Sequence, residues 1–161
     1  MRNRVAIAVV LSVLLAGCSR PETERLAGTW VPTSLEMDGE LAPQAALKDS
    51  RLFITGDTIV FQGGDLSARP EKQRYILNVN ASPRTIDIIV TIEEPPTFKK
   101  IDEDKIEPVP GKAYTATALG IYSLEGDTLQ LCMSKPGLKR RPTGFFTREG
   151  SGSTLMVFKR Q

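Results

Sequence analysis

The side chains most able to do chemistry are few in this chain, and the commonest of them is missing. The 161 residues include two cysteines and no histidine. Without histidine, the usual general base, the Ser-His-Asp arrangement and the commonest zinc ligand are all absent. No Gly-rich phosphate loop or paired-carboxylate motif stands out. These features predict a protein that is not an enzyme, although scattered aspartates and glutamates could still meet in space as a catalytic pair.

The two cysteines have different surroundings and indicate different roles. Cys132 stands between Leu131 and Met133 in an alternating segment, where a small and partly apolar side chain packs well. Because no histidine is present to activate its thiol, a buried structural role is favoured over a nucleophilic one. Cys18 instead ends an apolar N-terminal run, so the remaining chain has no partner for an internal disulfide.

The first residues have the features of a secretory signal. Arg2 and Arg4 precede an apolar run, Val5 to Leu15, that is too short to span a membrane. The following residues, LLAGC ending at Cys18, resemble the lipobox of bacterial lipoproteins. The resemblance implies a signal peptide over residues 1–17 and a diacylglyceryl group on Cys18, whose acyl chains (palmitate, for example) anchor the protein to the membrane. An ordinary secretory leader with an incidental cysteine is the alternative.

The residues after the lipidated cysteine indicate an address in the bacterial cell envelope. Residues 18–25 are polar and contain a proline, as expected of a short tether between the lipid and a folded domain. By resemblance to sorted envelope lipoproteins, Ser19 favours the outer membrane, on its periplasmic or surface face, over the inner membrane.

The charged residues argue against a polyanionic partner or a metal ion. Once Arg2 and Arg4 are removed with the leader, 19 of the 21 basic residues remain against 19 acidic ones. A nearly neutral domain has no footprint for nucleic acid. The cluster from Lys139 to Arg141 is predicted to be a solvated loop, with contact to anionic headgroups or phosphate as the alternative. The acidic run from Asp102 to Asp104 lacks the spacing and glycine of a calcium loop, so we predict no metal and no cofactor.

The elements that would position these residues are mostly strands. Between Gly120 and Met133, apolar and polar residues alternate on both sides of a Gly-Asp turn, which predicts a hairpin. Thr85–Glu93 has the clearest alternation in the chain, with an apolar β-branched residue at every second position. Further strands are predicted over residues 26–37, 51–55, 58–62, 74–80, 112–124, 143–148 and 153–160.

Two segments depart from the strand pattern. Ala42–Leu47 could form one short helical turn. Glu94–Gly111 is rich in proline and charge, which predicts a long polar loop that is either functional or mobile. About eight sequential antiparallel strands with short turns would either close into a barrel or stack as a sandwich, and closure removes the exposed edges.

Gly28-Thr29-Trp30, at the start of the first strand, resembles the G-x-W signature of lipocalin-like barrels. In those barrels the tryptophan fills the closed end, and a basic residue of the last strand lies across its ring. The resemblance places Arg160 in that role, with Lys159 as the alternative. Such a cation–π pair contributes about 1 kcal/mol.

Several other segments, spread over nearly the whole mature chain, resemble a family of secreted bacterial domains found mainly in planctomycetes. They are LAGTW at residues 26–30, PRTID at 83–87, GIYSLEGDTLQLC at 120–132, RPTGF at 141–145 and VFKR at 157–160. The resemblance implies an all-β, antiparallel up-and-down lipocalin-like β-barrel of about eight strands over residues 26–161. No activity is established for that family, so it implies no catalytic residues.

The first hypothesis for function is a barrel that binds a small hydrophobic or amphipathic ligand. Alternation predicts that five large side chains would line such a cavity: Phe61, Tyr75, Ile88, Tyr114 and Tyr122. The small residues Ala116, Ala118 and Gly120 on one strand face would leave room for the ligand. Close packing in a narrow barrel without a cavity explains the same small residues equally well.

The second hypothesis is a protein-interaction or scaffold module of the envelope. Its contact surface would be the Glu94–Gly111 segment and the turn at Lys139 to Arg141. The state of the interior discriminates between the two hypotheses. A connected cavity favours a ligand, whereas a filled interior beside an exposed apolar patch favours a protein partner.

Overall fold

The computed structural model describes residues 20–63, 72–102 and 105–161, without the side chains of residues 102, 105 and 106. The proposed signal peptide and Cys18 lie outside the described residues. The elements are α1 (Glu22–Leu26), β1 (Gly28–Met37), β2 (Glu40–Leu41), α2 (Gln44–Leu47), β3 (Arg51–Thr55), β4 (Thr58–Gln62), β5 (Gln73–Asn78), β6 (Thr85–Glu93), β7 (Thr97–Asp102), β8 (Lys105–Val109), β9 (Ala113–Glu125), β10 (Thr128–Ser134) and β11 (Ser153–Arg160). Among the described residues, no helix has the length and apolar character needed to cross a membrane.

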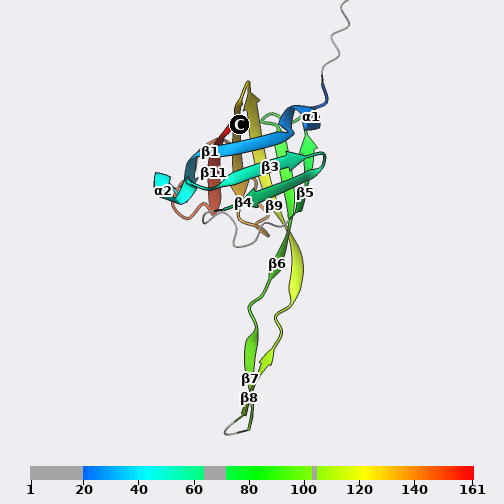
Figure 1. The fold of residues 1–161 in the computed structure, drawn as a ribbon, viewed down its shortest axis with the longest axis vertical. Coiled ribbons are helices and arrows are strands. Elements are labelled where there is room, and N and C mark those ends of the chain that lie inside the picture. Colours follow the sequence, from blue (N-terminus) through cyan, green and yellow to red (C-terminus); the bar gives the residue numbers. More distant parts are fainter. Residues whose placement is uncertain (1–19, 64–71, 103–104) are drawn as a thin grey trace, which may run out of the picture.

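The main sheet is a closed, antiparallel, eight-stranded β-barrel (Figure 1). Its strands follow one another in the order β1, β3, β4, β5, β6, β9, β10 and β11, and β11 pairs with β1 to close the ring. The closing register places Trp30 opposite Arg160 and Leu35 opposite Met156. The predicted fold class, an up-and-down lipocalin-like barrel, is confirmed.

Alternation along the strands builds the core inside this ring. On β6, Ile86 and Ile88 are buried, and their cross-strand neighbours on β9 are Gly120 and Ala118. The inner residues of the other strands complete one hydrophobic cluster, which includes Trp30, Leu52, Ile59, Leu129, Leu131 and Phe158. The predicted hairpins at residues 51–62 and 120–133 are confirmed, and α2 lies within the predicted helical turn.

The predicted strand over Thr143–Arg148 is wrong, because this segment forms an irregular cover on the outside of the barrel. Cys132 points away from the core residue Leu131 and is nevertheless fully buried, with its Sγ 3.8 Å from the carbonyl oxygen of Phe146. Arg141 holds the cover in place. Its guanidinium donates to both carboxylate oxygens of Asp87, at 2.5 and 3.0 Å, and to the carbonyl oxygen of Gly120 at 2.6 Å.

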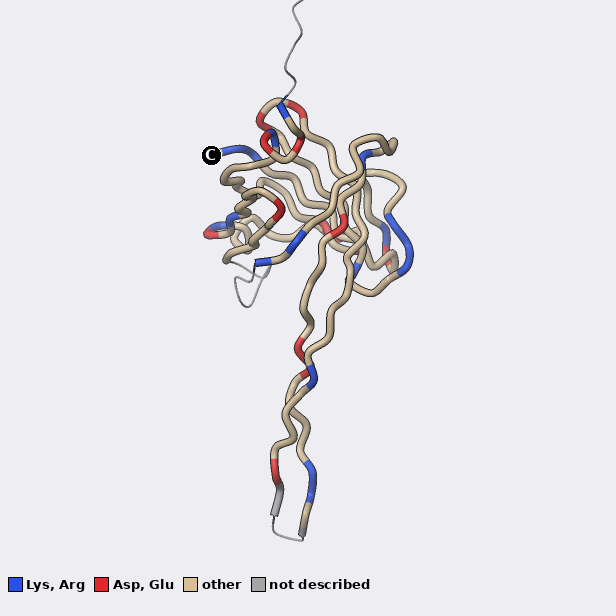
Figure 2. Tube along the Cα trace, turned by 90° about the vertical axis from the view of Figure 1, so that its right-hand side faces the viewer, with Lys and Arg blue, Asp and Glu red and all other residues tan. Residues whose placement is uncertain are grey.

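The prediction of a loop over Glu94–Gly111 is also wrong. β6 and β9 continue past the barrel rim, and β7 and β8 form a second, two-stranded sheet beyond them. These elements make a long hairpin that projects from the barrel in two views at right angles (Figures 1 and 2). Residues 91–102 and 105–115 are called the arm below. Its prolines and lysines conceal the strand pattern in the sequence, and a hairpin tolerates them because both of its strands are edges.

Candidate functional site

The closed end of the barrel is built around Trp30. Its side chain is fully buried, and its Nε1 donates a hydrogen bond of 2.9 Å to the carbonyl oxygen of Leu26 in α1. The guanidinium carbon of Arg160 lies 4.1 Å from the centroid of the Trp30 ring, which confirms the predicted pair. Arg160 also donates to the carbonyl oxygens of Ala27 and Arg25, at 2.7 and 2.5 Å. The last strand therefore fastens both the tryptophan and α1.

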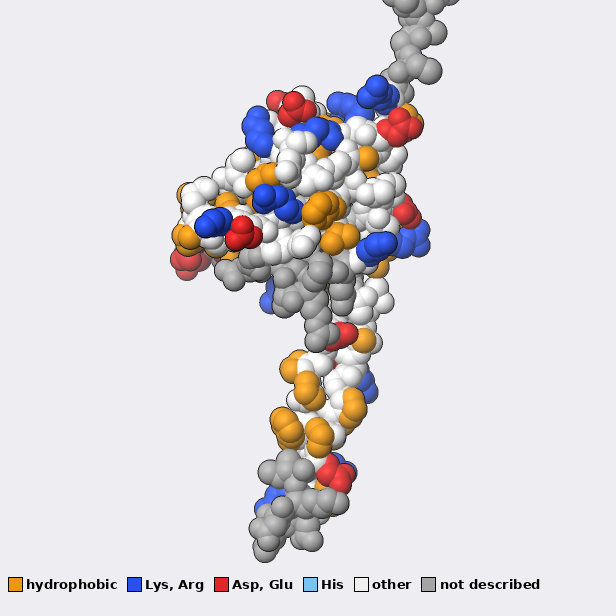
Figure 3. All heavy atoms as spheres, viewed as in Figure 1, with side chains coloured by type: hydrophobic (Ala, Val, Ile, Leu, Met, Phe, Trp, Pro, Cys, Tyr) orange, Lys and Arg blue, Asp and Glu red, His pale blue; other side chains and the backbone are white. Residues whose placement is uncertain are grey.

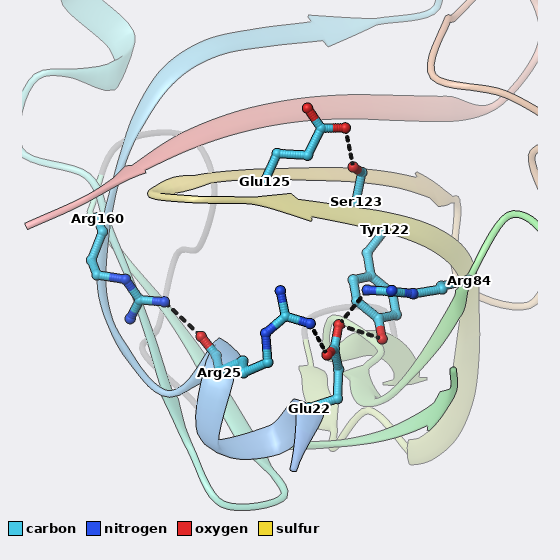
Figure 4. Close-up of polar contacts among 7 residues, drawn as sticks. All are labelled: Glu22, Arg25, Arg84, Tyr122, Ser123, Glu125 and Arg160. Atoms are coloured by element: carbon cyan, nitrogen blue, oxygen red, sulfur yellow. Dashed lines mark hydrogen bonds and ion pairs between the residues drawn. The ribbon is translucent and has the colours of Figure 1, made fainter. Parts of the chain in front are cut away.

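Glu22 is the centre of a polar cluster on the same end (Figure 4). Its carboxylate accepts hydrogen bonds from Arg25 at 2.6 Å, Arg84 at 2.7 Å and the Tyr122 hydroxyl at 3.3 Å. Its side chain is only 12% exposed. Residues 18–25 were predicted to form a tether, but Glu22 to Arg25 belong to α1 and pack on the barrel. Sequence reasoning missed this cluster because its members are far apart in the chain.

The Tyr122 hydroxyl is poorly solvated at this end of the barrel. Burial, with a smaller contribution from the Glu22 carboxylate, raises its pKa from the ordinary value of 10.0 to about 12. Between these two values the unfolded chain releases the phenolic proton while the folded chain keeps it, so rising pH favours unfolding. The contribution of Tyr122 to stability should be fully present below about pH 10 and should be lost as the pH rises toward 12.

This pH dependence can be measured with Tyr122→Phe. We expect the free energy of unfolding of the wild type, minus that of the variant, to fall as the pH rises from about 9 to 12. Urea denaturation at several pH values measures both quantities. Other ionisable groups are present in both proteins and cancel in the difference. A difference that stays constant across this range would contradict the assignment.

The barrel interior around Tyr75 and Tyr122 is packed with side chains. Tyr75 and Tyr122 point inward as predicted, but both are buried within the hydrophobic cluster. The Tyr75 hydroxyl donates to the carbonyl oxygen of Gly56 at 2.5 Å. The space beside Gly120 is occupied by Met133, whose Cε would lie 2.8 Å from an added Cβ. The small residue at position 120 therefore serves close packing.

A pocket of about 410 Å³ opens at the opposite end of the barrel, which we call the mouth. Phe61 and Ile88, two of the predicted lining residues, lie in its wall, together with Val90, Ala118, Met133 and Met156. Polar residues, among them Asp38, Gln73 and Lys135, complete the lining. The pocket can hold a small amphipathic molecule, and neither Tyr75 nor Tyr122 is among its lining residues.

Tyr114 is not a lining residue, and its predicted position in a barrel cavity is wrong. It pairs with Ile92 beyond the rim, on the part of β9 that enters the arm, and its side chain is 49% exposed. Three other arm side chains are similarly uncovered: Phe98 at 72%, Ile101 at 53% and Val109 at 41%. The space-filling view shows apolar side chains along the arm (Figure 3). Sequence alternation predicts which face of the strand Tyr114 occupies, but it does not predict the residue at which the barrel wall ends.

The remaining candidate residues for chemistry are Cys132, the acidic residues and the basic turn. Burial raises the pKa of the Cys132 thiol, which disfavours the reactive thiolate. No group of three or more His, Cys, Asp or Glu residues in the described chain could hold a metal ion. The acidic run at residues 102–104 lies outside the described side chains. In the cluster at Lys139 to Arg141, Arg141 bonds Asp87, and Arg140 donates to the carbonyl oxygen of Ser151 at 2.9 Å.

Comparison with known proteins finds no relative, since no family model, curated protein or solved structure matches this chain.

Proposed function

We propose that the protein is a lipocalin-like lipoprotein of the bacterial envelope, anchored through diacylglyceryl-Cys18, whose barrel presents the arm to a protein partner. The observation that carries this proposal is a projecting arm with uncovered apolar side chains, on a barrel whose interior is packed around Tyr75 and Tyr122. The side chain of Phe98 is 72% exposed, and the exposed side chains of Ile101, Val109 and Tyr114 lie on the same hairpin. Large apolar side chains without cover on a projecting element are suited to an interaction site.

The composition of the arm favours a protein over a bilayer as its partner. The sequence from residue 99 to 105 is KKIDEDK, which has three basic and three acidic residues among seven. Inserting such charges into the hydrocarbon region is costly. The apolar residues of the arm are therefore suited to a protein surface that also offers partners for charge.

The direction of the arm supports the same conclusion. Arg20, the first described residue, lies at the closed end with α1, whereas the arm leaves from the mouth (Figure 1). Only Ser19 separates Arg20 from Cys18 in the sequence. Because a residue spans at most about 3.6 Å, a lipid on Cys18 would hold the closed end close to the membrane surface. The arm would then extend away from the membrane that carries the protein.

Photo-crosslinking in intact envelopes tests this function. A crosslinking amino acid at position 98 or 101 of the lipidated protein should capture one protein of fixed mass. The matched controls are positions 41 and 76, where Leu41 and Ile76 are 67% and 60% exposed on the barrel. Crosslinks that come equally from the barrel positions, or from none of the four, would overturn the proposal.

The mouth pocket supports a second candidate function, the binding of a small hydrophobic or amphipathic ligand. Its apolar wall and polar rim suit such a molecule. Native mass spectrometry of the protein purified from its own envelope should then show an adduct of fixed mass. The adduct should disappear when Ala118→Trp fills the pocket. If the protein shows only its own mass at gentle voltages, without an adduct, the mouth pocket does not bind such a ligand.

A further inference from the structure

The outer half of the arm has two open edges. β7 and β8 pair with each other, and neither has a second neighbour among the described strands. An edge strand carries backbone N–H and C=O groups that can hydrogen-bond an added strand. Natural edges are commonly protected by proline, which cannot donate to a ladder.

Proline protects the two edges unequally. Pro108 lies within β8, and Pro110 follows directly after it. β7 has no proline between Thr97 and Asp102, because Pro95 and Pro96 both precede it. The outer edge of β7 is therefore the one without proline, and its register is regular from Thr97 to Lys100, before a shift between Lys100 and Asp102.

The side chains of β7 indicate what that strand should carry. Its central residues are Phe98, Lys99, Lys100 and Ile101, which is a basic pair between two exposed apolar residues. Lys99 lies across from Glu107 on β8, whereas Lys100 lies across from the apolar residue Ile106. In the register of β7 with β8, no carboxylate residue is therefore paired directly with Lys100. Opposite charges at directly paired positions stabilise a sheet, and like charges destabilise it.

A second copy of this chain is a poor occupant for the edge. The antiparallel register that pairs all of β7 with β7 of another copy would place Lys99 opposite Lys100 twice. Each such pair is repulsive. In addition, two copies anchored in one membrane would extend their arms in the same direction, so their β7 strands would run parallel.

We propose that the β7 edge binds an extended segment of the partner protein in which two adjacent acidic residues lie between two apolar residues. In an antiparallel arrangement, the acidic pair meets Lys99 and Lys100, and the apolar residues meet Phe98 and Ile101. Backbone hydrogen bonds along β7 supply affinity, and the side chains supply selectivity. This inference rests on the proposed function of the arm and names the chemistry of its partner.

Peptide binding to the full lipidated protein in nanodiscs tests the inference. The probe is a fluorescent, N- and C-terminally blocked peptide of sequence TVEEVT, and the matched control is TVKKVT. Fluorescence polarisation should show TVEEVT binding at least about tenfold more tightly, because two attractive pairs replace two repulsive ones. Methylation of alternate backbone nitrogens of TVEEVT should abolish binding. Amide hydrogen exchange should slow in β7 when TVEEVT is bound.

Charge reversal supplies the decisive control. The double variant Lys99→Glu/Lys100→Glu should reverse the preference to TVKKVT, whereas Lys112→Glu, an arm lysine outside β7, should leave it unchanged. Equal binding of the two peptides, no binding of TVEEVT, or full binding of the methylated peptide would overturn the inference. If crosslinks from positions 98 and 101 persist in that case, the arm still binds a partner, but by another mode.

Discussion

Replacing Trp30 with alanine should lower the free energy of unfolding by about 3–5 kcal/mol. The side chain is fully buried at the closed end, where its loss would leave a cavity that α1 and the strand ends cannot easily fill. The change also removes the hydrogen bond from Nε1 to the Leu26 carbonyl oxygen and the ring beneath Arg160. α1 would lose its hydrogen bond from Trp30, so the polar cluster at Glu22 should also loosen.

Guanidinium denaturation followed by circular dichroism measures this effect. Trp30 is the only tryptophan in the chain, so intrinsic tryptophan fluorescence disappears with the substitution. Trp30→Phe is the matched control, because it keeps most of the apolar volume and should lose less stability than Trp30→Ala. Arg160→Gln should cost about 1 kcal/mol for the cation–π contact alone. A Trp30→Ala protein with nearly wild-type stability would show that this residue does not organise the closed end.

The second large effect is expected at Gly120. A Cβ at this position would overlap Met133 Sδ and would lie 3.0 Å from the carbonyl oxygen of Cys132. Gly120→Val should therefore force Met133 and the neighbouring strand apart and lower the free energy of unfolding by about 1–3 kcal/mol. Denaturation of this variant beside the wild type measures the cost.

A double-mutant cycle identifies the origin of that cost. Met133→Ala alone should destabilise the protein, because Met133 is buried. Combined with Gly120→Val, it frees the space that the valine needs, so the double variant should be more stable than the sum of the two single effects predicts. Additive effects would mean that the backbone at position 120, and not Met133, resists a side chain.

The barrel could be predicted from the sequence because its strands and turns are marked by patterns of neighbouring residues. Thr85–Glu93 has an apolar β-branched residue at every second position, and the predicted strand bounds agree with β6. The Gly-Asp turns at residues 56–57 and 126–127 fix two hairpins, and hairpins in succession leave few topologies. Trp30 and Arg160 could also be matched, since a recurring motif marks the first residue and strand closure brings the last strand beside it.

The remaining features depend on contacts that no local pattern encodes. Glu22 joins Arg84 and Tyr122, which are 62 and 100 residues away in sequence, so residues 22–25 of the predicted tether form part of a helix that packs on the barrel. Cys132 is buried on the outer face by the irregular cover near Phe146, which alternation alone assigns to a strand. Tyr114 follows the inward pattern of β9, but the barrel wall ends before it. The position of a rim is a property of the whole ring.

The continuity of β6 and β9 from the barrel wall into the arm has a mechanical consequence. Within the ring, β6 pairs with β5 and β9 pairs with β10, while the arm begins as the same two strands. A partner that pulls on the arm against an anchor at the closed end would load these ladders along their length. Hydrogen bonds that are pulled along the strand direction are loaded in shear. They share the force, so they do not break one after another. A barrel of this construction is suited to transmit tension between its closed end and a body bound to the arm.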